Sequence, residues 1–229
     1  MEQIKKKKRN KVIRLIFGIL LLTVIGAGIF LYKTAFQPFS LSETVYIHIN
    51  KEKDYEEVVR QLKEKANLPS EKIFRMLSER MNYANKVKTG RYSIEDGITM
   101  PDVIRRLRSG NQAPVNLTFN NIRTGENLAG RLSQQLMVDS LSLLQAIDNP
   151  ANAEKFGFNH YTFVSMFIPN TYEVYWDTNI DNLLNRMKKE YDFFWNGERM
   201  EKARRIGLTP IQVSTLASIV EEEATYADE

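Results

Sequence analysis

The chain has 229 residues, no cysteine and a formal net charge of +4. Residues 1–14 carry seven basic side chains and one acidic one, which leaves 25 basic and 27 acidic side chains for the rest. Because that rest is close to neutral, it lacks the basic surface that nucleic acid binding requires. Thiolate chemistry is excluded, and the two histidines, His48 and His160, stand in no metal-ligand spacing, so we expect no metal and no other cofactor.

The first predicted element is a membrane anchor. No charged residue lies between Leu15 and Tyr32, and an apolar run of about 17–25 residues suffices to cross a bilayer. We predict a basic cytoplasmic tail over residues 1–14 and a single transmembrane helix over residues 15–32 that contacts the lipid bilayer. The basic residues precede the run, which places the remaining chain outside the cytoplasm. The alternative is a cleaved signal peptide, but its apolar region would be shorter and would end in small residues.

Residues 33–44 contain Pro38 and lack a clear period, so we expect a linker there. Beyond it, a β-rich run, a turn and an amphipathic helix follow one another three times. The runs are residues 45–49, 90–94 and 115–119, and the helices after them begin at Asp54, Thr99 and Thr124. A further helix is expected over residues 70–83. Short strands that alternate with helices predict an α+β fold with a small sheet and helices on one face.

Two helices are predicted in the last fifty residues. The first runs from Ile180 to Arg199 and has a core face formed by Leu183, Leu184, Met187, Tyr191, Phe194 and Trp195. The second begins at Thr209, because Thr209 and Gln212 form a capping box around Pro210. At about 100° per residue, its apolar side chains form one stripe: Val213, Leu216, Ala217, Ile219, Val220 and Ala224.

Three glutamates follow on this last helix. Glu221 lies at one border of the stripe, Glu222 points away from it, and Glu223 lies on the other flank. A carboxylate at the edge of an apolar face, beside like charges, is expected to keep its proton to a higher pH than usual. A general acid requires this property. An ordinary solvated helix end is the alternative interpretation of the same pattern.

The sequence of this helix resembles a known signature. Residues 216–223, Leu-Ala-Ser-Ile-Val-Glu-Glu-Glu, resemble the L-A-S-I-V-E-K-E motif of the MltG (YceG-like) family of membrane-anchored endolytic murein transglycosylases. The resemblance implies that Glu221 is the catalytic acid. This chain has Glu222 where the family commonly has lysine. Because that position turns outward on the helix, we expect the chemistry to be unaffected.

Two other segments resemble the same family. Residues 88–110 contain the pattern G-x-Y-x-I-x-x-G…L-x-x-G of its LysM-like subdomain, a region that helps to bind glycan in LysM modules, although folding roles explain the same residues. Residues 167–176 resemble the P-[DE]-T-Y segment, with Asn170 in place of the acid. Aromatic rings there either stack on sugars or fill a core. The candidate substrate-binding residues are Tyr172, Tyr175, Trp176, Ser218 and Glu223, with a structural ion as the alternative role for Glu223.

The resemblance also implies an activity and an organisation. The activity is cleavage of the β-1,4 bond between N-acetylmuramic acid and N-acetylglucosamine within peptidoglycan glycan strands, which forms 1,6-anhydro ends and terminates or trims nascent strands. A LysM-like subdomain over residues 45–114 and a catalytic domain over residues 115–229 would belong to a single-pass protein of the inner membrane. Family members continue through a D-P-T segment, so we expect this sequence to be an incomplete fragment that need not be active alone. Glycan strands are the expected partner, and peptidoglycan synthases stay open as another.

Three other interpretations stay open. The first is a membrane-tethered LysM-like module that binds peptidoglycan without cutting it. The second is a hydrolase, in which Glu223 or an acid outside this sequence activates water. The third is a purely structural membrane protein. A hydrolase leaves reducing ends, which are heavier than anhydro ends by one water, so the masses of the products separate it from a lytic transglycosylase.

Overall fold

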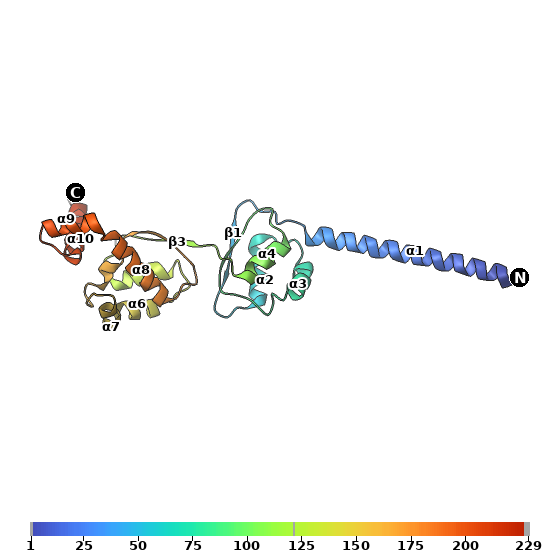
Figure 1. The fold of residues 1–229 in the computed structure, drawn as a ribbon, viewed down its shortest axis with the longest axis horizontal. Coiled ribbons are helices and arrows are strands. Elements are labelled where there is room, and N and C mark those ends of the chain that lie inside the picture. The colour runs from blue at the N-terminus through green and yellow to red at the C-terminus, as the bar shows by residue number, and fades with distance from the viewer. Residues whose placement is uncertain (1, 121, 227–229) are drawn as a thin grey trace. The chain divides into compact units, whose positions relative to one another are not determined.

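The structure is a computed structural model that describes residues 2–120 and 122–226, without the side chains of residues 2–14, 222 and 224–226. It divides into two compact units, Met1–Ala113 and Pro114–Glu229, called the first and the second unit below. Both units combine helices with a small antiparallel sheet, so the predicted α+β class is confirmed (Figure 1). The assignments of a LysM-like and a catalytic domain to these units remain predictions.

Helix α1 (Glu2–Ala35) is one continuous helix (Figure 1). Its segment Leu15–Ala35 is long and apolar enough to cross a membrane, which extends the predicted span by three residues. The criterion is length and composition, and a signal sequence also meets it. The basic side chains on which the predicted orientation depends belong to residues 5–14 and lie outside the described residues.

The expected linker is partly folded onto the first unit. The Phe39 side chain is buried in the core of that unit. Its backbone N–H donates to the carbonyl of Ile98 at 2.8 Å, and its carbonyl accepts from the N–H of Gly97 at 3.0 Å. The N–H of Leu41 donates to the Asp96 carboxylate at 2.9 Å. Part of the segment 33–44 is therefore a structural element of the unit and not a free connection.

The first unit has the order β–α–α–β–α. Strands β1 (Val45–Ile49) and β2 (Gly90–Ile94) pair antiparallel, with Ile47 opposite Tyr92. Helices α2 (Tyr55–Ala66) and α3 (Glu71–Arg80) lie between them in the chain, and α4 (Met100–Ser109) follows β2. The apolar faces of these elements form one core, in which the largest buried side chains include Phe39, Leu62, Phe74, Tyr83, Tyr92, Ile104 and Leu107.

The second unit contains more elements. Strand β3 (Val115–Phe119) pairs antiparallel with β4 (Asn170–Val174). Between them lie α5 (Gly125–Ser133), α6 (Ser140–Asp148), α7 (Pro150–Lys155) and the short 3-10 helix η1 (Phe163–Met166). Helices α8 (Ile180–Phe194), α9 (Gly197–Arg205) and α10 (Pro210–Tyr226) follow β4. The core collects apolar side chains from all of them, including Leu117, Leu128, Leu132, Leu143, Phe163, Tyr172, Leu184 and Met187.

Three predictions about these elements are corrected. The strand at residues 115–119 does not join the first two in one sheet, because it pairs with residues 170–174 in a separate sheet. The helices α6 and α7 and the strand β4 were not predicted at all. The helix expected to end at Arg199 ends at Phe194, and α9 begins at Gly197 after a short break.

The two units repeat one arrangement. The first strand and the first helix of the second unit begin 70 residues after their counterparts, at Val115 against Val45 and at Gly125 against Tyr55. The second strand and the helix after it begin 80 residues later, at Asn170 against Gly90 and at Ile180 against Met100. The additional residues fall between α6 and β4, where α7 and η1 lie. Both units therefore share the element order β–α–α–β–α, called the module below, although α6 packs against α5 whereas α3 packs against α4.

Two kinds of side-chain contact recur in the two units, one from a glutamine at a different position of each unit and one from a tyrosine at the same strand position. The Gln61 side chain accepts from the N–H of His48 at 3.1 Å and donates to its carbonyl at 2.8 Å. Gln135 makes the same pair of hydrogen bonds, both 2.9 Å, with Thr118. His48 and Thr118 are each the fourth residue of the first strand. In both units a glutamine thus satisfies backbone groups along the strand edge, Gln61 from within α2 and Gln135 from the turn after α5. Tyr92 and Tyr172 are each the third residue of the second strand and donate their hydroxyls to the carbonyl four residues earlier.

Candidate functional site

Helix α10 carries the candidate catalytic glutamate and starts as predicted. The N–H of Thr209 donates to Gln212 Oε1 at 2.8 Å, and the N–H of Gln212 donates to Thr209 Oγ1 at 3.3 Å. This reciprocal pair is the predicted capping box, with Pro210 as the first helical residue. Ile211 and Val213 are half-buried and pack against the core of the second unit. The first turn thus fixes α10 to that unit.

The rest of the apolar stripe is not buried, which corrects the prediction. The exposed fractions are 50% for Leu216, 54% for Ile219 and 58% for Val220, and Ala217 is also exposed. The physical reason is that α10 packs against α9 and η1 only near its beginning, as the half-buried Ile211 and Val213 show. Ala224, the last member of the stripe, lies outside the described side chains. The apolar surroundings expected for Glu221 are therefore not formed by the described residues.

The glutamates and Ser218 occupy the exposed part of α10. The side chains of Glu221 and Glu223 are both exposed, and two residues of a helix separate them by about 200°. They do not face one point in space together. The Ser218 hydroxyl donates to the Thr215 carbonyl within the helix at 2.8 Å. The predicted outward orientation of Glu222 concerns a side chain outside the described residues.

The aromatic candidates lie in β4 and directly after it, and they differ in exposure. Tyr172 is only 4% exposed, packs against Phe119 and is anchored by its hydroxyl, and burial raises its pKa to about 12. Its ring is part of the core and positions the strand. Tyr175, in contrast, is 56% exposed, and Trp176 is half-buried. Of the three predicted aromatic residues, Tyr175 is the one that presents a large ring surface to a ligand.

Tyr175 lines a cavity of about 420 Å³ in the second unit. Other side chains of the lining are Glu173, Thr178, Leu183 and Arg186. The guanidinium of Arg186 forms an ion pair with Glu190, one turn further along α8, at 2.8 Å. The sequence reasoning missed Thr178 and Arg186. An alignment of residues 90–110 with residues 170–190 identifies Arg186 from the sequence, because it pairs Tyr92 with Tyr172 and Arg106 with Arg186.

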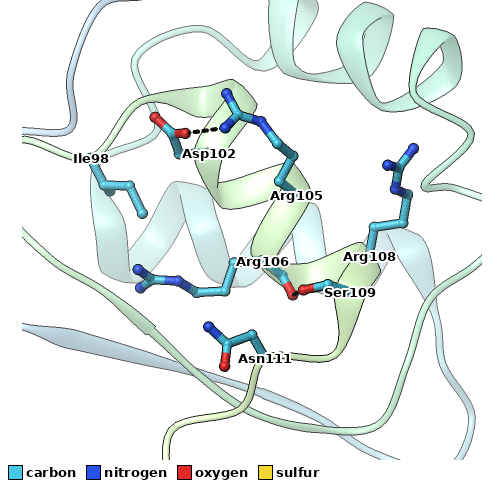
Figure 2. A pocket seen from close by; sticks show the side chains of 7 residues that line it. All are labelled: Ile98, Asp102, Arg105, Arg106, Arg108, Ser109 and Asn111. Atoms are coloured by element: carbon cyan, nitrogen blue, oxygen red, sulfur yellow. Dashed lines mark hydrogen bonds and ion pairs between the residues drawn. The ribbon is translucent and has the colours of Figure 1, made fainter.

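A second cavity, of about 650 Å³, lies on α4 in the first unit. Figure 2 shows that Arg105, Arg106 and Arg108 leave the helix in different directions and do not converge on one point. Each has a partner within the unit: Arg105 pairs with Asp102, Arg106 with Glu95, and Arg108 donates to the Met81 carbonyl. Neither this cavity nor the one beside Tyr175 is lined by a residue of α10.

The LysM-like pattern of residues 88–110 has folding roles throughout. Gly90 has a φ of +137°, and a Cβ atom there would lie 2.3 Å from the Gln112 side chain. Gly110 ends α4 in the left-handed region, with a φ of +80°. The apolar members of the pattern are fully buried: Tyr92, Ile94 and Leu107. Glycan contact by this segment remains a prediction.

These features define a two-unit α+β protein with a candidate membrane span among the described residues and an exposed acidic helix in the second unit. The profile of the YceG-like family matches residues 47–229. The chain therefore belongs to the YceG-like family. A solved structure of a YceG-like protein from Listeria monocytogenes is similar, with 14% sequence identity and a TM-score of 0.42. That alignment covers 74% of this chain and 61% of that protein, so the chain spans about three fifths of its length. The comparison with curated proteins found no match.

Proposed function

We propose that this chain is part of an endolytic lytic transglycosylase of peptidoglycan. Its substrate is the β-1,4 bond between N-acetylmuramic acid and N-acetylglucosamine within glycan strands. Cleavage leaves 1,6-anhydro ends and terminates or trims nascent strands. The protein is held in the cytoplasmic membrane by α1, with its N-terminus in the cytoplasm and both folded units outside.

The mechanism assigns two successive steps to one carboxyl group. Glu221 protonates the glycosidic oxygen while positive charge develops at C1 of the muramic acid. The resulting carboxylate then removes the proton from the C6 hydroxyl of the same sugar, and the C6 oxygen bonds to C1. No water enters the product, and the proton returns to Glu221. A paired second carboxylate, as in ordinary glycosidases, is not needed, which agrees with the opposite directions of Glu221 and Glu223 on α10.

The observation that carries the proposal is the place of Glu221. It follows Leu216-Ala217-Ser218-Ile219-Val220 on a capped helix inside the segment that matches the family. Because Glu221 and its apolar neighbours are exposed, the mechanism requires the bound glycan to exclude water from this face during the reaction. Leu216, Ile219 and Val220 supply the apolar surface for such exclusion.

Purified sacculi digested with the membrane-embedded chain test the proposal. Product masses are measured for the parent, for Glu221→Gln and for Glu223→Gln as the matched control. General acid–base catalysis contributes about 10²–10⁴-fold, so Glu221→Gln is expected to lose anhydro products by that factor, while Glu223→Gln keeps most of them. Undiminished anhydro products from Glu221→Gln contradict the assignment of the acid. Reducing ends in place of anhydro ends establish a hydrolase.

A second candidate function is a non-catalytic, membrane-tethered module that binds peptidoglycan. One observation favours it, namely that α10 has no cover over its apolar face among the described residues. The same digestion separates the two functions. If the parent and Glu221→Gln both bind sacculi and both leave them intact, the protein is a tether.

A further inference from the structure

The repeated module places two arginines at one equivalent position. Arg106 lies twelve residues after Ile94, the last residue of β2, and Arg186 lies twelve residues after Val174, the last residue of β4. Each arginine belongs to the helix that follows the second strand, and each lines a cavity. The buried residues around them also correspond: Val103, Ile104 and Leu107 in α4 match Leu183, Leu184 and Met187 in α8.

In the first unit this position already holds a carboxylate. The guanidinium of Arg106 donates to the Ser93 carbonyl at 2.6 Å and to Glu95 Oε2 at 2.5 Å. Glu95 is the first residue after β2. The fold therefore places a carboxylate beside the guanidinium from within the chain, and such charge-assisted hydrogen bonds are among the stronger ones.

In the second unit the equivalent of Glu95 is Tyr175. A tyrosine is neutral, so Tyr175 cannot form an ion pair with Arg186. Its ring is exposed and lines the cavity. Arg186 instead pairs with Glu190 on its own helix, and the two side chains are 48% and 26% exposed. An ion pair between neighbouring turns of one helix, with a guanidinium that is half exposed, stabilises the fold only weakly. An external carboxylate with better geometry can therefore replace Glu190.

We propose that the cavity beside Tyr175 binds a sugar that carries a carboxylate. Arg186 binds the carboxylate in the role that Glu95 fulfils for Arg106, and the Tyr175 ring stacks on the apolar face of the sugar. Thr178 and Glu173 line the same cavity and accept hydrogen bonds from hydroxyl or amide groups. The volume of about 420 Å³ lies within the range of small-ligand sites. The inference rests on the proposed function, because it names a part of the glycan that the second unit recognises.

The carboxylate has two sources in peptidoglycan. One is the lactyl group of muramic acid without a peptide, and the other is a carboxylate of the attached peptide. Neutral oligosaccharides of N-acetylglucosamine contain neither. Glu173 in the lining repels an anionic ligand. Binding of a carboxylate therefore requires that its attraction to Arg186 is stronger than its repulsion by Glu173. Removal of the Arg186 charge must therefore cost affinity for acidic ligands alone.

Calorimetric titration of the full chain in lipid nanodiscs tests the proposal, in a Glu221→Gln background so that no ligand is cleaved. The probes are N-acetylglucosamine tetramer, the peptide-free tetrasaccharide with alternating muramic acid, and the same tetrasaccharide with its peptides. At least one acidic ligand is expected to bind about tenfold more tightly than the neutral tetramer. Arg186→Gln is expected to abolish that difference. Lys189→Gln, which removes an exposed charge of α8 outside the cavity lining, should preserve it.

Two variants of Tyr175 complete the test. Tyr175→Glu introduces the carboxylate found in the first unit and is expected to abolish the preference for acidic ligands without loss of thermal stability. Tyr175→Ala is expected to weaken all three ligands by about three- to tenfold, whereas the exposed control Tyr161→Ala is not. Equal affinities for neutral and acidic ligands, or equal effects of Arg186→Gln and Lys189→Gln, overturn the proposal. These binding results do not depend on catalysis, so a failure of the proposed lytic activity is recognised separately, from the sacculus digestion.

Discussion

The two units share one module but complete it differently. In the first unit the helix after the second strand, α4, closes the core and ends at Gly110, and its Arg106 is paired with Glu95 inside the unit. In the second unit the equivalent helix α8 is followed by α9 and α10. There the arginine faces a cavity beside an exposed tyrosine, and α10 leaves apolar side chains uncovered.

This difference indicates where function resides in the molecule. The positions common to both units are the anchored tyrosines, the buried helix residues and the arginine of the helix after the second strand, and in the first unit all of them have structural roles. The candidate functional residues of the second unit occur where it departs from the first, at Tyr175 in place of Glu95 and on the additional helix α10. The arginine itself is shared, and what differs is its surroundings: an internal carboxylate in the first unit and an exposed tyrosine beside a cavity in the second.

The sharpest test of the comparison uses leucine truncations. Leu62 and Leu132 are fully buried at equivalent positions of the two modules, whereas Leu216 on α10 is half exposed. Leu62→Ala and Leu132→Ala are each expected to lower the free energy of unfolding by about 2–5 kcal/mol. Leu216→Ala should change it by less than about 0.5 kcal/mol. Urea unfolding followed by circular dichroism measures all three variants. Both tryptophans, Trp176 and Trp195, lie in the second unit, so tryptophan fluorescence followed in parallel reports that unit alone.

The control for this experiment is the unit that is not mutated. Leu62→Ala should leave the tryptophan transition unchanged, and Leu132→Ala should shift it. A loss of several kcal/mol on Leu216→Ala would mean that the apolar face of α10 is covered in solution, in contradiction to the exposed side chains described above.

Much of the module could be predicted from the sequence. The strands at 45–49, 90–94 and 115–119 are confirmed at both ends, because alternating apolar side chains determine which face of a strand is buried. The starts of α2, α5 and α10 are also confirmed, since Asp54, Thr124 and Thr209 accept hydrogen bonds from the backbone of the following turn. Strand periodicity and helix caps are local signals, so the residues of one segment suffice to predict that segment.

The features that the sequence did not reveal depend on distant contacts. Strand β4 presents only Tyr172 as a fully buried residue, so its own pattern is weak, and it is identified by its pairing with β3. Periodicity shows that Leu216, Ile219 and Val220 share a face of α10, but not whether another element covers that face. The cavity combines Tyr175 from the end of β4 with Arg186 from α8, and no single motif contains both.

The strand-edge glutamines provide a test of intermediate size. Gln61 is buried and Gln135 is partly exposed, although both make two hydrogen bonds to a strand backbone. Gln61→Ala leaves the partly buried N–H and carbonyl of His48 without these bonds and is expected to cost about 1–3 kcal/mol. Gln135→Ala should cost about 0.5–1.5 kcal/mol, because water can replace the lost side chain.

Thermal unfolding followed by circular dichroism measures both losses. The exposed neighbour Gln134 serves as control, and Gln134→Ala should lie within about 0.5 kcal/mol of the parent. If Gln61→Ala has no effect, the contact with His48 does not stabilise the strand edge.

The smallest expected effect concerns the ion pair that distinguishes the units. Partial burial opposes ionisation of Glu95, but hydrogen bonds from Ser93 and Arg106 outweigh it and hold the pKa of Glu95 below its ordinary value of 4.5. A lowered pKa in the folded state means that ionised Glu95 stabilises the protein above about pH 4.5, and that this contribution is lost as the pH falls through the lowered pKa. Because the Glu95 side chain is 43% exposed, we expect about 0.2–1 kcal/mol at pH 7.

Arg106→Gln should therefore lower the free energy of unfolding of the first unit at pH 7 by that amount. Its effect should be smaller near pH 2, because the contribution of ionised Glu95 decreases as the pH falls through the lowered pKa. In the second unit, position 175 offers Arg186 no carboxylate. Arg186→Gln removes only the pair with Glu190 and should cost no more than about 0.5 kcal/mol at pH 7. Urea unfolding at the two pH values measures both variants. If Arg106→Gln is as costly at pH 2 as at pH 7, its hydrogen bond to the Ser93 carbonyl, and not the pair with Glu95, is what stabilises the first unit. The presence of Tyr175 where the first unit has Glu95 would then not explain a difference in the electrostatic stability of the two units.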